Sequence, residues 1–173
     1  MKVEPGESTL VKDTEVGTIS IHNEVLGILN LQPDNPTKIV LIGADANELS
    51  PLIIGPKYKS GVTLMEDLSS FSEVQSSEHY DYAYLLGYRA SPDRPTNVRK
   101  MLGLLNHVSI LIFSSDVPCS ANRQISFWPS YWLNIFQEND CEVSFDLRSA
   151  LWFDNRIPPR ILESILLVHR RLR

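Results

Sequence analysis

The sequence predicts a single α/β domain in which a mainly parallel sheet is covered by helices on both faces. Short apolar runs that suit buried strands alternate along the chain with stretches of helical periodicity. The length of 173 residues suits one domain, and no composition shift marks a boundary within it. Hydrophobic residues make up 43% of the chain and charged residues 21%, which is the balance of a globular protein with its own core.

The spacing of apolar residues predicts the elements in order. Apolar residues three and four positions apart indicate amphipathic helices, and uninterrupted apolar runs indicate strands buried on both faces. Residues 1–20 form a polar, loose lead-in that includes either a loop or a short edge strand at 17–21. The expected elements are a helix at 21–29, a strand at 38–43, a helix at 48–58 capped by Asn47, strands at 61–65 and 80–87, a helix that starts near Thr96 with Thr96 or Asn97 as its cap, a strand at 108–113, a helix at 129–139, and strands at 141–147 and 164–169.

Two stretches of the sequence determine how many strands the sheet has and in which direction its last strands run. The segment 66–80 is serine-rich and barely has room for both a helix and a further strand, so the sheet is either complete or trimmed there. The segment 148–160 contains two consecutive prolines and no convincing helix, which predicts that the last two strands form an antiparallel pair. In such sheets ligands bind at the carboxyl ends of the strands. A site is therefore expected among residues 43–47, 66–67, 87–88 and 114–116.

Two stretches resemble a known family. Residues 39–50 (IVLIGADANELS) look like a strand, a glycine-containing turn and a helix. The tail carries a W-P-S-Y-W helix from Trp128, a W-F-D-N-R-I turn from Trp152 and an apolar last strand. Together they resemble class I S-adenosylmethionine-dependent methyltransferases, in particular bacterial enzymes that act on small molecules. The resemblance covers about residues 38–173 and implies a Rossmann-like methyltransferase fold with an antiparallel C-terminal strand pair.

The resemblance implies a cofactor site for S-adenosylmethionine. Family members use a G-x-G-x-G turn there, of which this chain keeps Gly43 and replaces the other two glycines by Asp45 and Asn47. Asp and Asn tolerate left-handed backbone best among the other residues, so the turn can persist. The Asp45 carboxylate would then either pair with the ammonium group of the cofactor or fill the pocket. Glu66 and Asp67 match the acidic position that holds the ribose hydroxyls, and Gly87 completes the expected cofactor set.

The expected substrate contacts are Tyr88, Asp116 and Arg123. The catalytic group stays unknown, because related tails often carry a histidine before the aromatic helix and this chain has none there. Methyl transfer to an amine or an acidic hydroxyl can depend mostly on positioning. The four histidines are scattered and are expected to be structural or on the surface, and most of the aromatic residues of the tail are expected in the core.

Composition excludes several function classes. The net charge of −5 argues against nucleic-acid binding, which needs a basic face. No apolar run suggests a signal peptide or a membrane span, and no cysteine or histidine spacing suggests a metal site, so a cytoplasmic protein without metal is expected. Cys119 and Cys141 are expected to be free thiols, as is usual in a reducing compartment.

Two functions from different classes remain open. The first is methyl transfer from S-adenosylmethionine to a small molecule such as a sugar or a sugar nucleotide. The second is a catalytically inactive protein of the same fold that binds a protein partner as a regulatory subunit. A trimmed sheet would expose an edge strand, and pairing of that edge with a second copy would give a homodimer. A dinucleotide-dependent oxidoreductase is weaker, because the glycine fingerprint is absent.

Overall fold

The computed structural model describes residues 20–31, 37–55, 61–68, 78–116 and 129–170. These residues form an α/β fold around a mixed sheet with the strand order β2-β1-β3-β4-β6-β5. The strands are β1 (Ile39–Ile42), β2 (Val62–Met65), β3 (Tyr80–Tyr88), β4 (Val108–Ser115), β5 (Cys141–Ser144) and β6 (Leu166–Arg170). The helices are α1 (Ile21–Ile28), α2 (Ala44–Glu48), α3 (Ser50–Ile54), α5 (Arg94–Leu105), α6 (Pro129–Glu138), α7 (Asp146–Leu151) and α8 (Pro159–Leu162).

The sheet is mostly parallel, as the sequence predicts. Strands β2, β1, β3 and β4 pair in parallel, with Val40 of β1 opposite Thr63 of β2 and Ala83 of β3. Strand β6 runs antiparallel to both of its neighbours, β4 and β5. The expected antiparallel pair of the last two strands is therefore confirmed.

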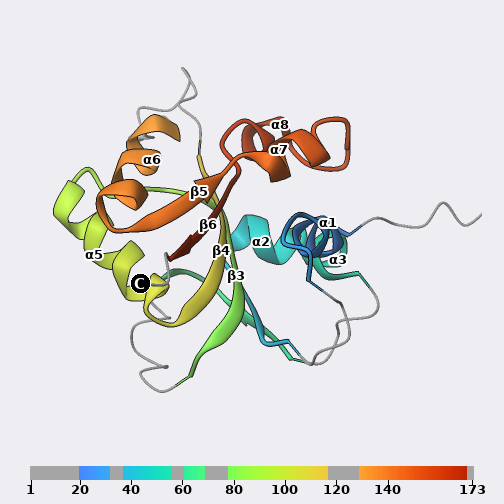
Figure 1. Ribbon diagram of the computed structural model, residues 1–173, viewed down its shortest axis with the longest axis horizontal. Coiled ribbons are helices and arrows are strands. Elements are labelled where there is room, and N and C mark those ends of the chain that lie inside the picture. Colours follow the sequence, from blue (N-terminus) through green and yellow to red (C-terminus); the bar gives the residue numbers. More distant parts are fainter. Residues whose placement is uncertain (1–19, 32–36, 56–60, 69–77, 117–128, 171–173) are drawn as a thin grey trace, which may run out of the picture.

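Helices cover both faces of the sheet (Figure 1). Alternate residues of each central strand point to opposite sides, so Val40 and Ile42 join one core cluster while Ile39 and Leu41 join the other. The first cluster includes residues of α5 and α6, and the second includes residues of α1, α2, α3, α7 and α8. All four residues of β1 are buried, as expected for a strand covered on both faces.

The helix expected at 48–58 is wrong in its limits and its cap. The chain turns into α2 directly after Gly43 and starts a second short helix, α3, at Ser50. Pro51 lies in the first turn of α3 and has no N–H to donate to the preceding turn, so α2 cannot continue through it. Asn47 lies inside α2 and caps neither helix.

Helix α5 also starts earlier than expected. Asp93 is its N-cap and accepts a hydrogen bond from the backbone N–H of Thr96 at 2.9 Å, while Pro95 occupies the first turn. Asn97, one of the two caps expected from the sequence, is instead buried and bonds both backbone groups of Ser91. It fastens the loop that follows β3 to the helix.

The region between the last two strands contains two short helices that the sequence did not reveal. Strand β5 stops at Ser144, whose hydroxyl accepts a hydrogen bond from the backbone N–H of Asp146 at the start of α7. Arg156 donates two side-chain hydrogen bonds to Asp154, which close the turn before α8. Helix α8 begins at Pro159, a residue that is favourable at this position because its φ is already helical.

The remaining expectations on the fold concern the chain start and the edge beside β2. Ile21 begins a helix rather than ending an edge strand, and Ser20 caps this helix by accepting a hydrogen bond from the backbone N–H of Asn23. No strand occurs between β2 and β3 within the residues that the structure describes, and residues 69–77 lie outside them. In the same described ranges no helix is both long and apolar enough to cross a membrane.

Candidate functional site

A pocket of about 320 Å³ opens at the carboxyl ends of β1, β2 and β3. Its walls are Gly43–Asp45 after β1, Glu66–Leu68 after β2, and Leu85–Arg89 at the end of β3. The chain runs from β1 to β2 on one side and then to β3 on the other side, so the strand order switches at this point. A ligand site is expected at such a switch point, and a volume of this size is within the usual range for small molecules.

The backbone after β1 turns at a single glycine. Gly43 has φ +94°, a value that side chains rarely tolerate, and it precedes the first residue of α2. Among the described residues, a Cβ on Gly43 would contact only the carbonyl oxygen of Leu86, at 3.9 Å, so no described side chain crowds this part of the backbone. The expectation that Asp45 and Asn47 also occupy left-handed turn positions is wrong, because both residues lie within α2.

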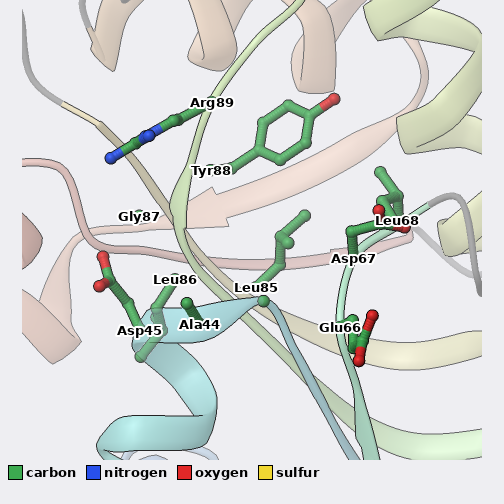
Figure 2. A pocket seen from close by; sticks show the side chains of 11 residues that line it. Ala44, Asp45, Glu66, Asp67, Leu68, Leu85, Leu86, Gly87, Tyr88 and Arg89 are labelled. Atoms are coloured by element: carbon green, nitrogen blue, oxygen red, sulfur yellow. The ribbon is translucent and has the colours of Figure 1, made fainter.

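Asp45 lies at one end of the pocket and is held by an ion pair. One carboxylate oxygen accepts a hydrogen bond from Nη2 of Arg160 in α8 at 2.8 Å. The other oxygen lies against Gly87, where a Cβ would come within 1.9 Å of it. Figure 2 shows Asp45 beside Gly87 on one side of the pocket and Glu66, Asp67 and Leu68 on the opposite side.

The side opposite Asp45 combines two carboxylates with an apolar wall. Glu66 and Asp67 follow the last residue of β2 and are exposed, whereas Leu68 next to them is buried. A carboxylate can accept hydrogen bonds from two neighbouring hydroxyl groups, as on a ribose. The arrangement therefore suits a ligand with a polyhydroxylated part on the carboxylates and a flat apolar part against the leucines of the pocket.

Tyr88 connects the pocket to the core. Tyr88 lines the pocket, and its ring packs against Trp132 of α6, with ring centroids 5.5 Å apart. Burial, and to a lesser extent the nearby Tyr131, raises the pKa of Tyr88 to about 12. The hydroxyl of Tyr88 therefore stays protonated at neutral pH, where it can donate a hydrogen bond but cannot act as a general base.

Two other predicted site residues, Asn47 and Asp116, are not part of the pocket lining. Asn47 donates a side-chain hydrogen bond to the carbonyl of Met65 at 3.2 Å, which fastens α2 to the end of β2. Asp116 follows β4 and forms an ion pair with Arg89 at 3.3 Å, so it reaches the pocket only through a lining residue. Arg123 lies outside the described residues.

A scan against protein-family models, a search of curated proteins and a search of solved structures each returned no match to this chain.

None of the histidines lines the pocket in the described part of the chain. His22 is fully buried behind the sheet and shares a 2.8 Å hydrogen bond with the hydroxyl of Tyr84. His79 bonds Ser109, and His169 faces Glu142 on the neighbouring strand at 3.4 Å. These placements agree with structural or surface roles. Cys141 is a free, buried thiol as expected, while Cys119 is not among the described residues.

The aromatic residues of the C-terminal part differ in their burial. Trp132 and Phe136 are fully buried, in agreement with the expected core role. Trp152 and Phe153 are not in the core, since they are 53% and 94% exposed on the turn between α7 and α8. Trp128 lies outside the described residues.

The sequence did not point to Arg89, Leu68, Leu85 or Arg160. The first three adjoin predicted strand ends, so an extension of each expected site by one or two residues would have included them. Arg160 is 115 positions away from Asp45 and follows the proline pair, and no local pattern connects the two.

Proposed function

We propose that this chain is a class I methyltransferase-like protein that binds S-adenosylmethionine in the pocket and acts on a small molecule. The observation that carries the proposal is the pocket itself, which is formed at the switch point by Gly43, Glu66 and Gly87 together with their neighbours. The sheet is mainly parallel, and its last strand in the sequence, β6, runs antiparallel between β4 and β5. This arrangement also agrees with the fold that the resemblance implies.

The pocket residues fit the chemical groups of this cofactor. Gly43 leaves open space beside the backbone, which allows close approach of a ligand. Glu66 and Asp67 can accept hydrogen bonds from the ribose hydroxyls, and the apolar side chains of Leu68 and Leu85 offer a surface for the base. When bound, the cofactor supplies a methyl group that an acceptor nucleophile attacks.

The protein side of the reaction is mainly binding and orientation. The described lining contains no histidine, and the Tyr88 phenol is protonated at neutral pH. Tyr88 can orient an acceptor by donating a hydrogen bond, and its ring is held by packing against Trp132. Acceptors whose attacking atom needs little help from a base, such as an amine or an acidic hydroxyl, suit this site best.

The proposal is tested by ligand-induced stabilisation. A ligand present at a hundred times its dissociation constant stabilises the folded state by about 2.7 kcal/mol. S-adenosylmethionine and S-adenosylhomocysteine are expected to raise the melting temperature in a saturable way. Glu66→Gln should weaken this response, because an amide loses one acceptor oxygen and the charge. Glu142→Gln, an exposed acidic position on β5, is the matched control and should leave it unchanged. No shift of the wild type at millimolar ligand would refute the proposal.

A second function, a catalytically inactive binding subunit, is favoured by different observations. The Asp45 carboxylate rests on Gly87 and is tied to Arg160, so one end of the pocket is occupied by the chain itself. Leu64 on the edge strand β2 is 59% exposed, and Phe153 is almost fully exposed, which leaves apolar surface for a partner or a second copy. This function predicts no response to either ligand and an assembly larger than a monomer in light scattering.

A further inference from the structure

Arg89 gives one wall of the pocket a positive charge. Among the described residues that line the pocket, it is the one with a cationic side chain. Glu66 and Asp67 follow β2, whereas Arg89 follows β3, and β1 lies between these two strands. The third carboxylate of the lining, that of Asp45, is already paired with Arg160 at 2.8 Å. The pocket therefore has an acidic side and a basic side, which orients a ligand that carries a charged group.

A β-bulge determines where Tyr88 and Arg89 point. Strand β3 advances three residues from Leu85 to Tyr88, while its partner β4 advances two. In a regular strand Leu85 and Tyr88 would lie on opposite faces, but both pack in the core cluster that includes residues of α5 and α6. Figure 2 shows the Arg89 side chain on the other side of the strand end, away from the Tyr88 ring. The extra residue thus turns the ring toward the core and leaves the guanidinium at the pocket.

The Arg89 side chain is anchored through Nε. The carboxylate of Asp116 lies 3.3 Å from this atom, and the backbone N–H of Asp116 donates a hydrogen bond to the carbonyl of Tyr88 at 3.0 Å. Nε carries one of the five N–H groups of a guanidinium, so the ion pair does not need the two Nη amino groups. The Arg89 side chain is 72% exposed, which makes these amino groups accessible to a ligand.

The Nη end of a guanidinium suits an anionic group with two oxygens. Its two amino groups bind a carboxylate or a phosphate through parallel hydrogen bonds, and a neutral sugar offers no such group. Glu66 and Asp67 repel an anion, so a ligand of this kind turns its charge toward the β3 side of the pocket. The residues after β1 and β2 are those proposed to hold the nucleoside of the cofactor, which leaves the β3 side for the methyl acceptor.

We propose that Arg89 is a specificity-determining residue that binds a carboxylate or phosphate group of the methyl acceptor. The inference rests on the proposed function. It restricts the substrate class from small molecules in general to anionic ones, so that a sugar phosphate or a sugar nucleotide is accepted and the neutral sugar is not.

The test is an NMR titration of the isotope-labelled full chain with two anionic probes, inorganic pyrophosphate and succinate, at constant ionic strength. The wild type is expected to bind at least one of them, with signal shifts at the backbone N–H groups of residues 87–89. A response to pyrophosphate assigns a phosphorylated acceptor, and a response to succinate alone assigns a carboxylate. Arg89→Gln should lower the affinity about tenfold, because the charge-assisted hydrogen bonds are lost. Arg89→Lys should restore part of the loss, since lysine keeps the charge without the fork of donors.

Arg94→Gln is the matched control. It removes the same charge from an exposed ion pair, that with Glu138 at 2.7 Å, and Arg94 does not line the pocket. This variant should bind the probe as the wild type does. Saturation with S-adenosylhomocysteine should also leave the affinity for the probe unchanged, because acceptor and cofactor occupy the pocket together.

Three results would overturn the inference and leave the proposed function intact. They are no response to either probe in the millimolar range, an equal loss of affinity in Arg89→Gln and Arg94→Gln, and competition between the probe and S-adenosylhomocysteine. Competition would mean that Arg89 contacts the cofactor and not the acceptor. Binding of the probe at Arg89 without any response to S-adenosylhomocysteine would instead overturn the proposed function, and the acceptor role of Arg89 with it.

Discussion

The buried His22 makes the stability of this protein depend on pH in a way that can be measured. Its side chain is fully buried, with the Tyr82 ring 4.6 Å away edge-on and the Tyr84 hydroxyl at 2.8 Å from Nδ1. Burial lowers the pKa of His22 from 6.5 to about 4, because the charged imidazolium would lose its hydration. The folded state therefore holds His22 neutral where the unfolded chain already binds a proton.

The sign and size of the effect follow from this difference. Above the unfolded pKa of 6.5 both states are neutral at His22, and the stability is at its full value. Between 6.5 and about 4 the unfolded state binds more protons, so the free energy of unfolding falls as the pH falls. Each pH unit corresponds to about 1.4 kcal/mol, so the interval removes about 3 kcal/mol, and the effect levels off below the folded pKa.

The assay is urea unfolding at steps from about pH 7.5 to about pH 4. Protonation of carboxylates also contributes there, so the informative quantity is the difference between the wild type and His22→Asn, which lacks the titrating group. The wild type should lose about 3 kcal/mol more than His22→Asn across the range. His79→Asn, at an exposed histidine, should keep the slope of the wild type. Parallel curves for the wild type and His22→Asn would refute the reasoning.

Three further predictions concern a helix cap, core packing and backbone strain, and each is tested by urea unfolding at neutral pH. Ser20→Ala removes the cap of α1 and should cost about 1 kcal/mol; an unchanged midpoint would contradict the capping role. Trp132→Ala should cost about 3–5 kcal/mol because the ring is fully buried, whereas Trp152→Ala should change stability by less than about 0.5 kcal/mol; similar losses would contradict their different burial. Gly43→Ala should cost about 1–2 kcal/mol through its positive φ, while Gly103→Ala, at an open helical position, should stabilise by about 0.5–1 kcal/mol; the same sign for both would argue against backbone strain at Gly43.

The central strands were predictable because they are apolar on both faces, and such segments are stable only in the interior of a covered sheet. Runs such as Ile39–Ile42 and Leu111–Phe113 are apolar on both faces, and only a sheet covered on both sides buries them completely. The antiparallel end was predicted because the sequence between the last two strands shows no convincing helix; the strand direction is right, although α7 and α8 lie in that region. The helix limits were less predictable, because Asp93 determines the start of α5 through its capping hydrogen bonds with Thr96, and Pro51 ends α2 because it has no N–H to donate.

The candidate site was predictable on one side only. Glu66 and Asp67 follow a strand directly, so the rule that ligands lie at carboxyl ends was sufficient to include them. Arg160 was not predictable, since its contact with Asp45 depends on how α8 packs on the sheet and not on any local spacing. Asn47 was assigned to the site by analogy with a turn, but it lies in a helix and holds the end of β2.

Gly87 shows why a glycine at a strand end does not by itself indicate a ligand. A side chain there would collide with the Asp45 carboxylate, and the φ of +65° also favours glycine. Contacts within the chain thus explain Gly87 completely. Gly43 differs, because within the described ranges a Cβ there would meet only one atom, at 3.9 Å, and Gly43 itself lines the pocket. Of the two glycines, Gly43 is the one whose surroundings leave room for a ligand, and its side of the pocket is where binding should be mapped first.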